Sequence, residues 1–468
     1  MEEVENPSES SATNSPQLLH TTANFDADDV DSSLIEKVKG DPIGNTLYSQ
    51  RFVLATLMKL TKGLEKPISE DEDFEKDLCT LWDQTVEPDV VKFLLEYNFL
   101  ELFTAALDEN DPRLTEILVG IIANAVSLPE TRVVLEESPE ITCTLISLIS
   151  STDSLILVQL MRLLQGMLVF ENSGDEMIWF QYFSSVEDFV DKFSFVLASS
   201  TSNTLLKHSL DALYAICAKF AVIEIMPEGG KSTFIDMFVT STLITGLIEA
   251  FRQVLGNNPV DYEEGLSMPT ENEVKFMSLF LDVNVILTQY KEKSHVAYEE
   301  KLVDFLECLS RILSPLTQPI YLLPVTTTHQ GVIENCSDIL QALDFPLNNS
   351  IFKQLLIIFN LLAESKEAKK TKKSTEKQSE WDSDSEDDES TGNIDLEDLQ
   401  CTILECLTKL STKFEQEEIH KRTFLDEKLI KTFLNGIEKC ENVESIDDLK
   451  DLRDFLSKFL TQNDSKMK

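Results

Sequence analysis

The strongest candidate for a nucleotide-binding loop in this sequence is EGGKST at residues 228–233. A phosphate-binding loop needs a further glycine five residues before the glycine that precedes the lysine, so that backbone N–H groups can wrap the phosphates. Ile225 occupies that position, and no hydrophobic strand that ends in aspartate follows. The segment therefore favours a glycine-containing loop between helices, and we predict no nucleotide cofactor.

The histidines and cysteines show none of the spacings that build a metal site. The sequence has no His-Glu-x-x-His and no Cys-x-x-Cys pattern, and its histidines are dispersed. Cys401 and Cys406 fall on one expected helix, which supplies too few ligands for zinc. The acidic run DSDSEDDES lacks the glycine and the terminal glutamate of a calcium loop. We predict no metal and no catalytic residue, with His208 at the surface or in a groove. An enzyme with scattered catalytic residues is an alternative.

Charge and composition exclude several classes of function. The 468 residues include 83 Asp and Glu against 40 Lys and Arg, which gives a net charge of −43. A field of this sign repels nucleic acid and anionic lipid, so we expect no direct binding to nucleic acid or membrane. The polar N-terminus lacks a signal sequence, and the longest apolar stretch, at 355–363, is half a membrane span. We expect a soluble intracellular protein.

A basic cluster precedes the acidic run in the same segment. Its members are Lys369, Lys370, Lys372 and Lys373. Nuclear import receptors recognise such clusters, but a solvated linker has the same composition, and both interpretations stay open. Ser383 and Ser385 precede acidic residues, as acidophilic kinases prefer, and phosphorylation there would add negative charge beside the lysines. We expect a location in the nucleus, with the cytoplasm as a second compartment.

Helical periodicity dominates residues 110–290. Three segments start at Asp111, Asp153 and Asn203, which are helix-capping residue types, and each then places apolar residues at +3, +7, +10, +14 and +17. Alternating steps of four and three keep one helix face apolar. The predicted core positions are Leu114, Leu118, Ile121, Leu128, Ile156, Leu160, Leu163, Phe170, Leu206, Leu210, Leu213 and Phe220. A fourth copy, from about Glu273, supplies Phe276, Phe280, Val283, Leu287 and Tyr290.

These repeats predict an all-α fold, an armadillo- or HEAT-like α-solenoid. The first three copies start 42 and 50 residues apart (111 to 153 to 203), close to the period of those repeats. An irregular helical bundle is the alternative, because any buried helix shows this spacing. We expect a disordered acidic and polar tail at 1–38 and the repeat domain at 39–363. We expect a disordered charged linker at 364–393 after this domain. C-terminal helices at 394–462 should then pack on or cap the solenoid, with a tail at 463–468.

The segment DPRLTEILVGIIANAVSLPETRVVL (111–135) resembles the third helix of an armadillo repeat, with its Asp-Pro cap, Gly120 and Asn124. Together with GDPIGNTLYSQRFVLATLMKL (40–60) and LCTLWDQTVEPDVVKFLLEYN (78–98), it resembles the serum amyloid A-like (saal) protein family. The name implies no likeness to serum amyloid A itself. The resemblance is good over about 40–130 and looser beyond. It implies an armadillo-type, intracellular and nuclear protein that is associated with cell proliferation and has no enzymatic activity.

An importin-like peptide groove would need an asparagine in successive repeats. Only Asn124 occupies that column, where the other copies have Gly166, Ile216 and Ile286. We therefore predict against this mode, and expect Trp82 and Trp179 in the core. The predicted function is a non-enzymatic protein–protein interaction scaffold whose acidic surface favours a basic partner. The alternative is an acidic chaperone or adaptor for histone or ribosomal proteins, and no residue pattern indicates an oligomeric state.

Overall fold

The structure is a computed structural model that describes residues 41–62, 67–107, 111–169, 177–224, 233–256, 268–343, 349–376, 395–412, 425–439 and 449–466. Helices account for its regular structure, and no strand occurs in these ranges beyond an isolated bridge between Pro42 and Ser49. This confirms the all-α fold class. The predicted tail at 1–38, the loop at 228–232, Phe170, Ser383 and Ser385 lie outside the described residues.

The helices follow one another in a fixed order along the chain. They are α2 (Gln50–Thr61), η1 (Ile68–Glu70), α3 (Glu72–Gln84), α4 (Pro88–Glu96), α5 (Phe99–Ala105), α6 (Pro112–Ala125), α7 (Pro129–Glu137), α8 (Pro139–Ser147), η2 (Leu148–Ser150), α9 (Ser154–Leu168), α10 (Met177–Ser185), α11 (Phe189–Ser199), α12 (Asn203–Glu224), α13 (Thr233–Phe238), α14 (Ser241–Leu255), α15 (Glu271–Thr288), α16 (Lys291–Glu299), α17 (Leu302–Leu313), η3 (Pro315–Thr317), α18 (Pro319–Leu322), α19 (Thr327–Ala342), α20 (Asn349–Glu376), α21 (Leu396–Ser411), α23 (Glu427–Ile437) and α24 (Leu449–Lys466).

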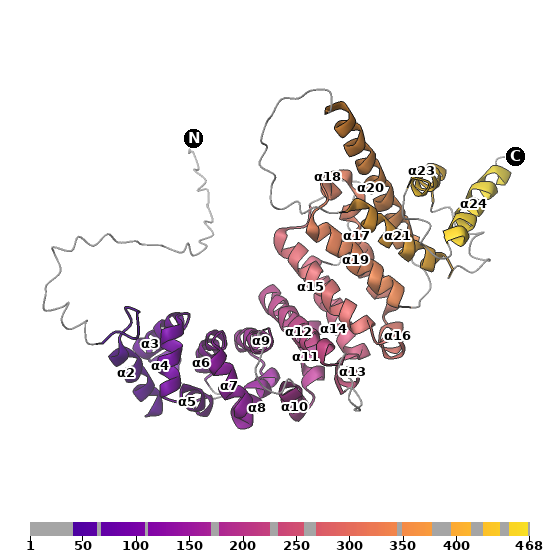
Figure 1. The fold of residues 1–468 in the computed structure, drawn as a ribbon. Helices are drawn as coiled ribbons and strands as arrows, with labels where there is room; N and C mark the ends of the chain where they lie inside the picture. Colours follow the sequence, from indigo (N-terminus) through magenta and orange to yellow (C-terminus); the bar gives the residue numbers. More distant parts are fainter. Residues whose placement is uncertain are drawn as a thin grey trace, which may run out of the picture.

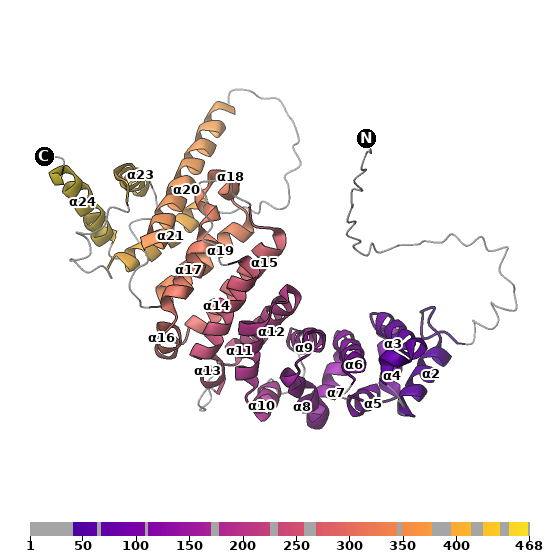
Figure 2. The ribbon, with the colours of Figure 1, turned by 180° about the vertical axis from the view of Figure 1, so that it is seen from behind.

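The described helices form a two-layered solenoid with a three-helix repeat. The third helices pack in chain order, from α3 through α6, α9, α12, α15 and α19 to α21. The middle helices α11, α14, α17, α20 and α23 pack in chain order beside them. In Figure 1 the chain follows an arc with α6, α9, α12 and α15 on its inner side and α8, α10, α13 and α16 on its outer side, and Figure 2 shows the same order from behind. Each repeat therefore buries its apolar faces against the next one.

Side-chain caps fix where the third helices begin. Asp111 Oδ1 accepts a hydrogen bond from Leu114 N at 3.1 Å and so caps α6, and Asp153 caps α9 in the same way. The cap of α12 is Ser202, one residue before the expected Asn203. The helix of the fourth copy, α15, is capped by Thr270, three residues before the expected start of that copy at about Glu273.

A complete capping box explains that earlier start. The hydroxyl of Thr270 accepts from Glu273 N at 3.3 Å, and the carboxylate of Glu273 accepts from Thr270 N at 2.7 Å. The periodic apolar residues begin only one turn later, so the sequence pattern alone places the start of this helix too far along the chain.

The predicted core columns lie on the buried faces of these helices. Every described member of the three columns has 9% exposure or less, from Leu114 in α6 to Phe220 in α12. In the fourth copy, Phe276, Phe280, Val283 and Leu287 are buried, and Tyr290 is partly buried against the core. Burying one such side chain contributes about 1.5–3 kcal/mol, so a contiguous column stabilises the stack more than any single helix could by propensity.

The helices near the C-terminus continue the same ladder. Helix α20 runs to Glu376, past the expected linker start at 364, because ESKEAKKTKK consists mainly of good helix formers. The predicted import lysines therefore have their backbone in the last turns of α20. Helix α21 packs on α19 and α20, and α24 packs on α21 and α23, ending at Lys466 rather than at 462. In the described part of the chain, no single helix is long and apolar enough to cross a membrane; α6 and α7 reach that length only together, bent by 115°.

Candidate functional site

The side chain of Asn124 links three successive third helices. Its Nδ2 donates to the carbonyl oxygen of Trp82 at 3.2 Å and to Thr85 Oγ1 at 3.3 Å, both at the end of α3. Its Oδ1 accepts from Arg162 Nη2 of α9 at 2.8 Å. The amide that could grip a peptide backbone is therefore engaged within the fold, where it ties α3, α6 and α9 together.

Trp82 fills the space above Gly120. A Cβ atom at residue 120 would lie 2.1 Å from Cζ2 of this indole, so only glycine leaves room for the ring. Trp82 is partly buried and packs against the core. Trp179 is fully buried, and its Nε1 donates to Glu136 Oε1 at 3.1 Å. Both rings pack between helices, and that of Trp82 remains partly exposed to solvent.

His208 of α12 lies beside Asp211 and near Arg162, with its Nδ1 4.0 Å from Asp211 Oδ2. Partial burial lowers the pKa of His208; the carboxylate of Asp211 opposes this effect, and the positive charge of Arg162 adds to it. Burial likewise raises the pKa of Asp211. No described serine or cysteine is hydrogen-bonded to this imidazole, so the pair lacks the nucleophile that base catalysis would activate.

Three of the buried cysteines, Cys217, Cys308 and Cys336, are protonated thiols at neutral pH. Burial raises the pKa of Cys308 to about 12, and it also raises the pKa values of Cys217 and Cys336. Because the thiolate is the reactive form, these side chains act as small apolar groups. In the described ranges, no group of three or more His, Cys, Asp and Glu side chains is arranged to hold a metal ion.

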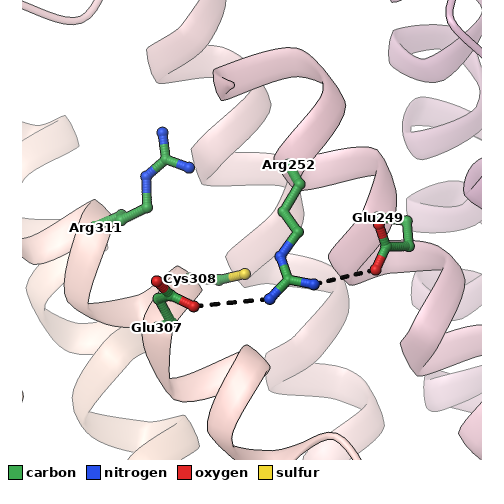
Figure 3. Close-up of a pocket in the computed structure, with 5 residues that line it drawn as sticks. All are labelled: Glu249, Arg252, Glu307, Cys308 and Arg311. Carbon is green, nitrogen blue, oxygen red and sulfur yellow. Dashed lines mark hydrogen bonds and ion pairs between the residues drawn. The ribbon is translucent and has the colours of Figure 1, made fainter. Parts of the chain in front are cut away.

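A polar pocket of about 320 Å³ lies between α14 and α17 and is drawn in Figure 3. Arg252 at its centre pairs with Glu249 at 3.1 Å, with Asp304 at 2.6 Å and with Glu307 at 3.7 Å. Arg311 lies on the other side, and its Nη2 donates to the carbonyl oxygen of Leu255 at 2.7 Å. Both guanidinium groups are thus bound by α14 and α17, and the pocket is a junction between two middle helices rather than a ligand site.

A second and larger hollow, of about 770 Å³, lies among α9, α11, α12 and η2. Its walls include Leu157 and Leu205 together with many serine and threonine side chains from the turns before α9 and α12. Phe195 of α11 forms part of the wall and is 69% exposed. An exposed aromatic ring beside a hollow of this size is typical of a protein-binding surface. We take this surface, named the Phe195 hollow below, as the candidate functional site.

The sequence did not single out Phe195. The residues on either side of it, Ser194 and Val196, are buried, so FSFVL reads as a continuous core segment. The signal that could have found it is the helical phase: Phe193 and Leu197 occupy the core face, which places Phe195 on the opposite side.

The architecture and this surface define the chain as an all-α solenoid of three-helix repeats with an exposed candidate docking site. No protein-family model matches the chain. Among curated proteins, it is 27% identical to Protein SAAL1 of Homo sapiens over 242 residues, which cover 47% of this chain and 50% of that protein. It is 28% identical to Protein saal1 of Danio rerio over 177 residues, 36% of this chain and 37% of that protein. The chain thus spans at most about half the length of these relatives, and the similarity supports the family resemblance over that part.

Proposed function

We propose that this chain is a non-enzymatic scaffold that binds other proteins. The observation that carries the proposal is the Phe195 ring, which lies exposed beside a hollow of about 770 Å³ on a helical ladder. A solenoid holds such a surface in place through its neighbouring repeats, without a closed active site. The buried thiols and the internally bound arginines of the α14–α17 pocket further support a role without catalysis.

The proposed partner is a basic protein. With a net charge of −43, the chain produces a long-range field that steers cationic partners toward it and disfavours acidic ones. Such association weakens as salt rises, because the Debye length shortens to about 8 Å at physiological ionic strength. Salt dependence therefore separates this function from binding that is purely apolar.

Affinity purification of the tagged full-length chain tests the proposal. Purification at about 50 mM salt, followed by mass spectrometry, is compared with purification at about 300 mM salt. We expect a small set of basic proteins that is enriched over a tag-only control at low salt and reduced at high salt. Recovery of nothing above the control at low salt, with proximity labelling in cells equally empty, would overturn the scaffold function.

An acidic adaptor or chaperone for histone or ribosomal proteins is the second candidate function. The observation that favours it is the acidic run at 380–390, which lies outside the described residues and could mimic nucleic acid. Deletion of residues 380–390 is expected to abolish binding of purified core histones under this function. Undiminished histone binding by the deletion variant would exclude the run as the docking site.

We further propose that the basic cluster at 369–373 directs the chain to the nucleus. Replacement of its four lysines by alanine should shift a fluorescent fusion toward the cytoplasm, whereas replacement of Lys291, Lys293 and Lys301 by alanine serves as a control of similar charge change. An unchanged nuclear fraction would show that the basic cluster is not a nuclear import signal.

The association with cell proliferation rests on the family resemblance. Depletion of the protein, followed by rescue with the intact chain, tests it through the doubling time of the cells. A doubling time that does not change on depletion would contradict the association.

A further inference from the structure

One face of α11 combines two carboxylates with the exposed ring. Asp191, Phe195 and Ser199 follow one another at steps of four, so they lie along a single stripe of α11, and Asp188 is the residue directly before its first turn. All four line the Phe195 hollow. The stripe therefore brings negative charge and an aromatic ring to the same wall.

The neighbouring middle helix shows that an aromatic residue at this position is unusual. The buried residues of α11 and α14 follow the same spacing, and aligning Phe193 with Leu247 aligns Phe195 with Glu249. The adjacent repeat thus has a charged residue where this one exposes a phenyl ring. Packing within the solenoid does not require an aromatic residue here, since the equivalent helix forms without one.

The two carboxylates of this wall have no cationic partner in the described structure. Neither Asp188 nor Asp191 forms an ion pair with a described residue. Lys192 also lines the hollow, and its Nζ donates to the carbonyl oxygen of Glu187 at 2.8 Å. Three helix N-termini lie at this region: Asp153 caps that of α9, Asp188 and Asp191 lie at that of α11, and Ser202 caps that of α12. Among the charged lining residues, two carboxylates stand against one lysine, so the hollow has a net negative charge that favours a cation.

We propose that the Phe195 hollow binds an arginine side chain, and the apolar residue next to it, from a partner protein. The guanidinium group stacks on the Phe195 ring and pairs with Asp191 and Asp188, while the apolar residue packs toward Leu157 and Leu205. Arginine fits better than lysine because its planar, weakly hydrated cation can stack and pair at the same time. This inference rests on the proposed scaffold function and assigns that function a site and a ligand chemistry.

A defined probe tests the site on the full-length chain. The probe is a fluorescein-labelled peptide of sequence Gly-Arg-Leu-Gly-Arg-Leu-Gly, and its binding is followed by fluorescence anisotropy. The same peptide with lysine in place of arginine should bind several-fold more weakly. Phe195→Ala, which removes the ring without a change of charge, should weaken binding several-fold. Asp191→Asn should weaken it by about threefold.

Val303→Ala is the matched control. Val303 is 79% exposed on α17, so the substitution truncates another exposed apolar side chain without a change of charge and should leave probe affinity unchanged. Circular dichroism establishes that each variant is folded. Replacement of the probe leucines by photo-leucine should give cross-links within 149–157 and 188–205. Equal affinities for Phe195→Ala and the intact chain, or cross-links confined to other segments, would overturn the assignment.

Affinity purification with the Phe195→Ala variant separates this inference from the broader function. If the intact chain enriches partners and the variant loses them, both stand. If the variant enriches the same partners to the same extent, the scaffold function stands and the hollow is not its site. If the intact chain enriches none, the function itself fails.

Discussion

Substitution of Gly120 by alanine should destabilise the N-terminal repeats, although alanine is the better helix former. The added methyl group would lie 2.1 Å from Trp82 Cζ2 and 2.3 Å from Cε2, well inside van der Waals contact. The indole must move outward and lose part of its packing on α6. Gly331, within α19, is the matched control, because a Cβ atom there meets nothing within 4 Å.

The two substitutions should have opposite signs. Overpacking of a well-filled site costs about 1–3 kcal/mol, and exchange of glycine for alanine in a helix gains about 0.5–1 kcal/mol. The free energy of unfolding should therefore fall by about 0.5–2 kcal/mol for Gly120→Ala and rise by about 0.5–1 kcal/mol for Gly331→Ala. Trp82→Phe replaces the indole, whose outer benzene ring makes the clash, by a shorter aromatic side chain. The double variant with Gly120→Ala should therefore lose less stability than the sum of the two single changes.

Hydrogen–deuterium exchange measured by mass spectrometry localises the effect. A loss of about 0.5–2 kcal/mol should speed exchange of α3 and α6 amides by about 2–30-fold while α19 is unchanged. The Trp82 emission should also shift to longer wavelength as the ring gains solvent. Slower exchange in α6 for Gly120→Ala, or equal stabilisation by both alanines, would refute the packing argument.

Three further predictions concern the caps, the turns and the buried thiols. Arg132→Met should destabilise the chain by about 1–3 kcal/mol in urea unfolding, because Nη1 of Arg132 donates to the carbonyl oxygen of Val126 at 2.7 Å and that buried acceptor would lose its partner; an unchanged midpoint would contradict this role. Thr270→Ala should remove the cap of α15, which contributes about 1 kcal/mol, and so speed amide exchange at the start of that helix. Thr270→Ser keeps the capping hydroxyl and should leave the exchange rate as it is in the intact chain. Cys308, with a pKa of about 12, should resist iodoacetamide at pH 8 until urea unfolds the chain, and its labelling in the native protein would show that the thiol is accessible.

Local signals in the sequence predicted the helices and their buried faces well. Asp111 and Asp153 mark the starts of α6 and α9, because a carboxylate that follows a break and precedes periodic apolar residues caps a helix wherever it occurs. The apolar columns gave the core positions for the same reason: their spacing matches the helical repeat. The start of α15 was misplaced because its capping box comes before the apolar periodicity begins.

Composition misled the prediction at α20. Charge blocks suggested a linker from residue 364, yet the lysines and glutamates there are also good helix formers, and α20 continues to Glu376. Lys366 Nζ pairs with Glu397 Oε2 of α21 at 2.6 Å, a contact between residues far apart in the sequence. A charge pattern cannot indicate which partner another helix will supply.

The sequence by itself determined that this chain is helical, repetitive and acidic, because periodicity, capping and net charge are properties of neighbouring residues and of their sum. The tertiary structure decided which side chains remain available to bind a partner. It engaged the amide of Asn124 between α3 and α9, paired Arg252 with carboxylates of α14 and α17, and left Phe195 exposed beside two aspartates that form no ion pair within the described ranges. Availability depends on the groups that other repeats bring within hydrogen-bonding distance, and the stacking of the repeats fixes that distance.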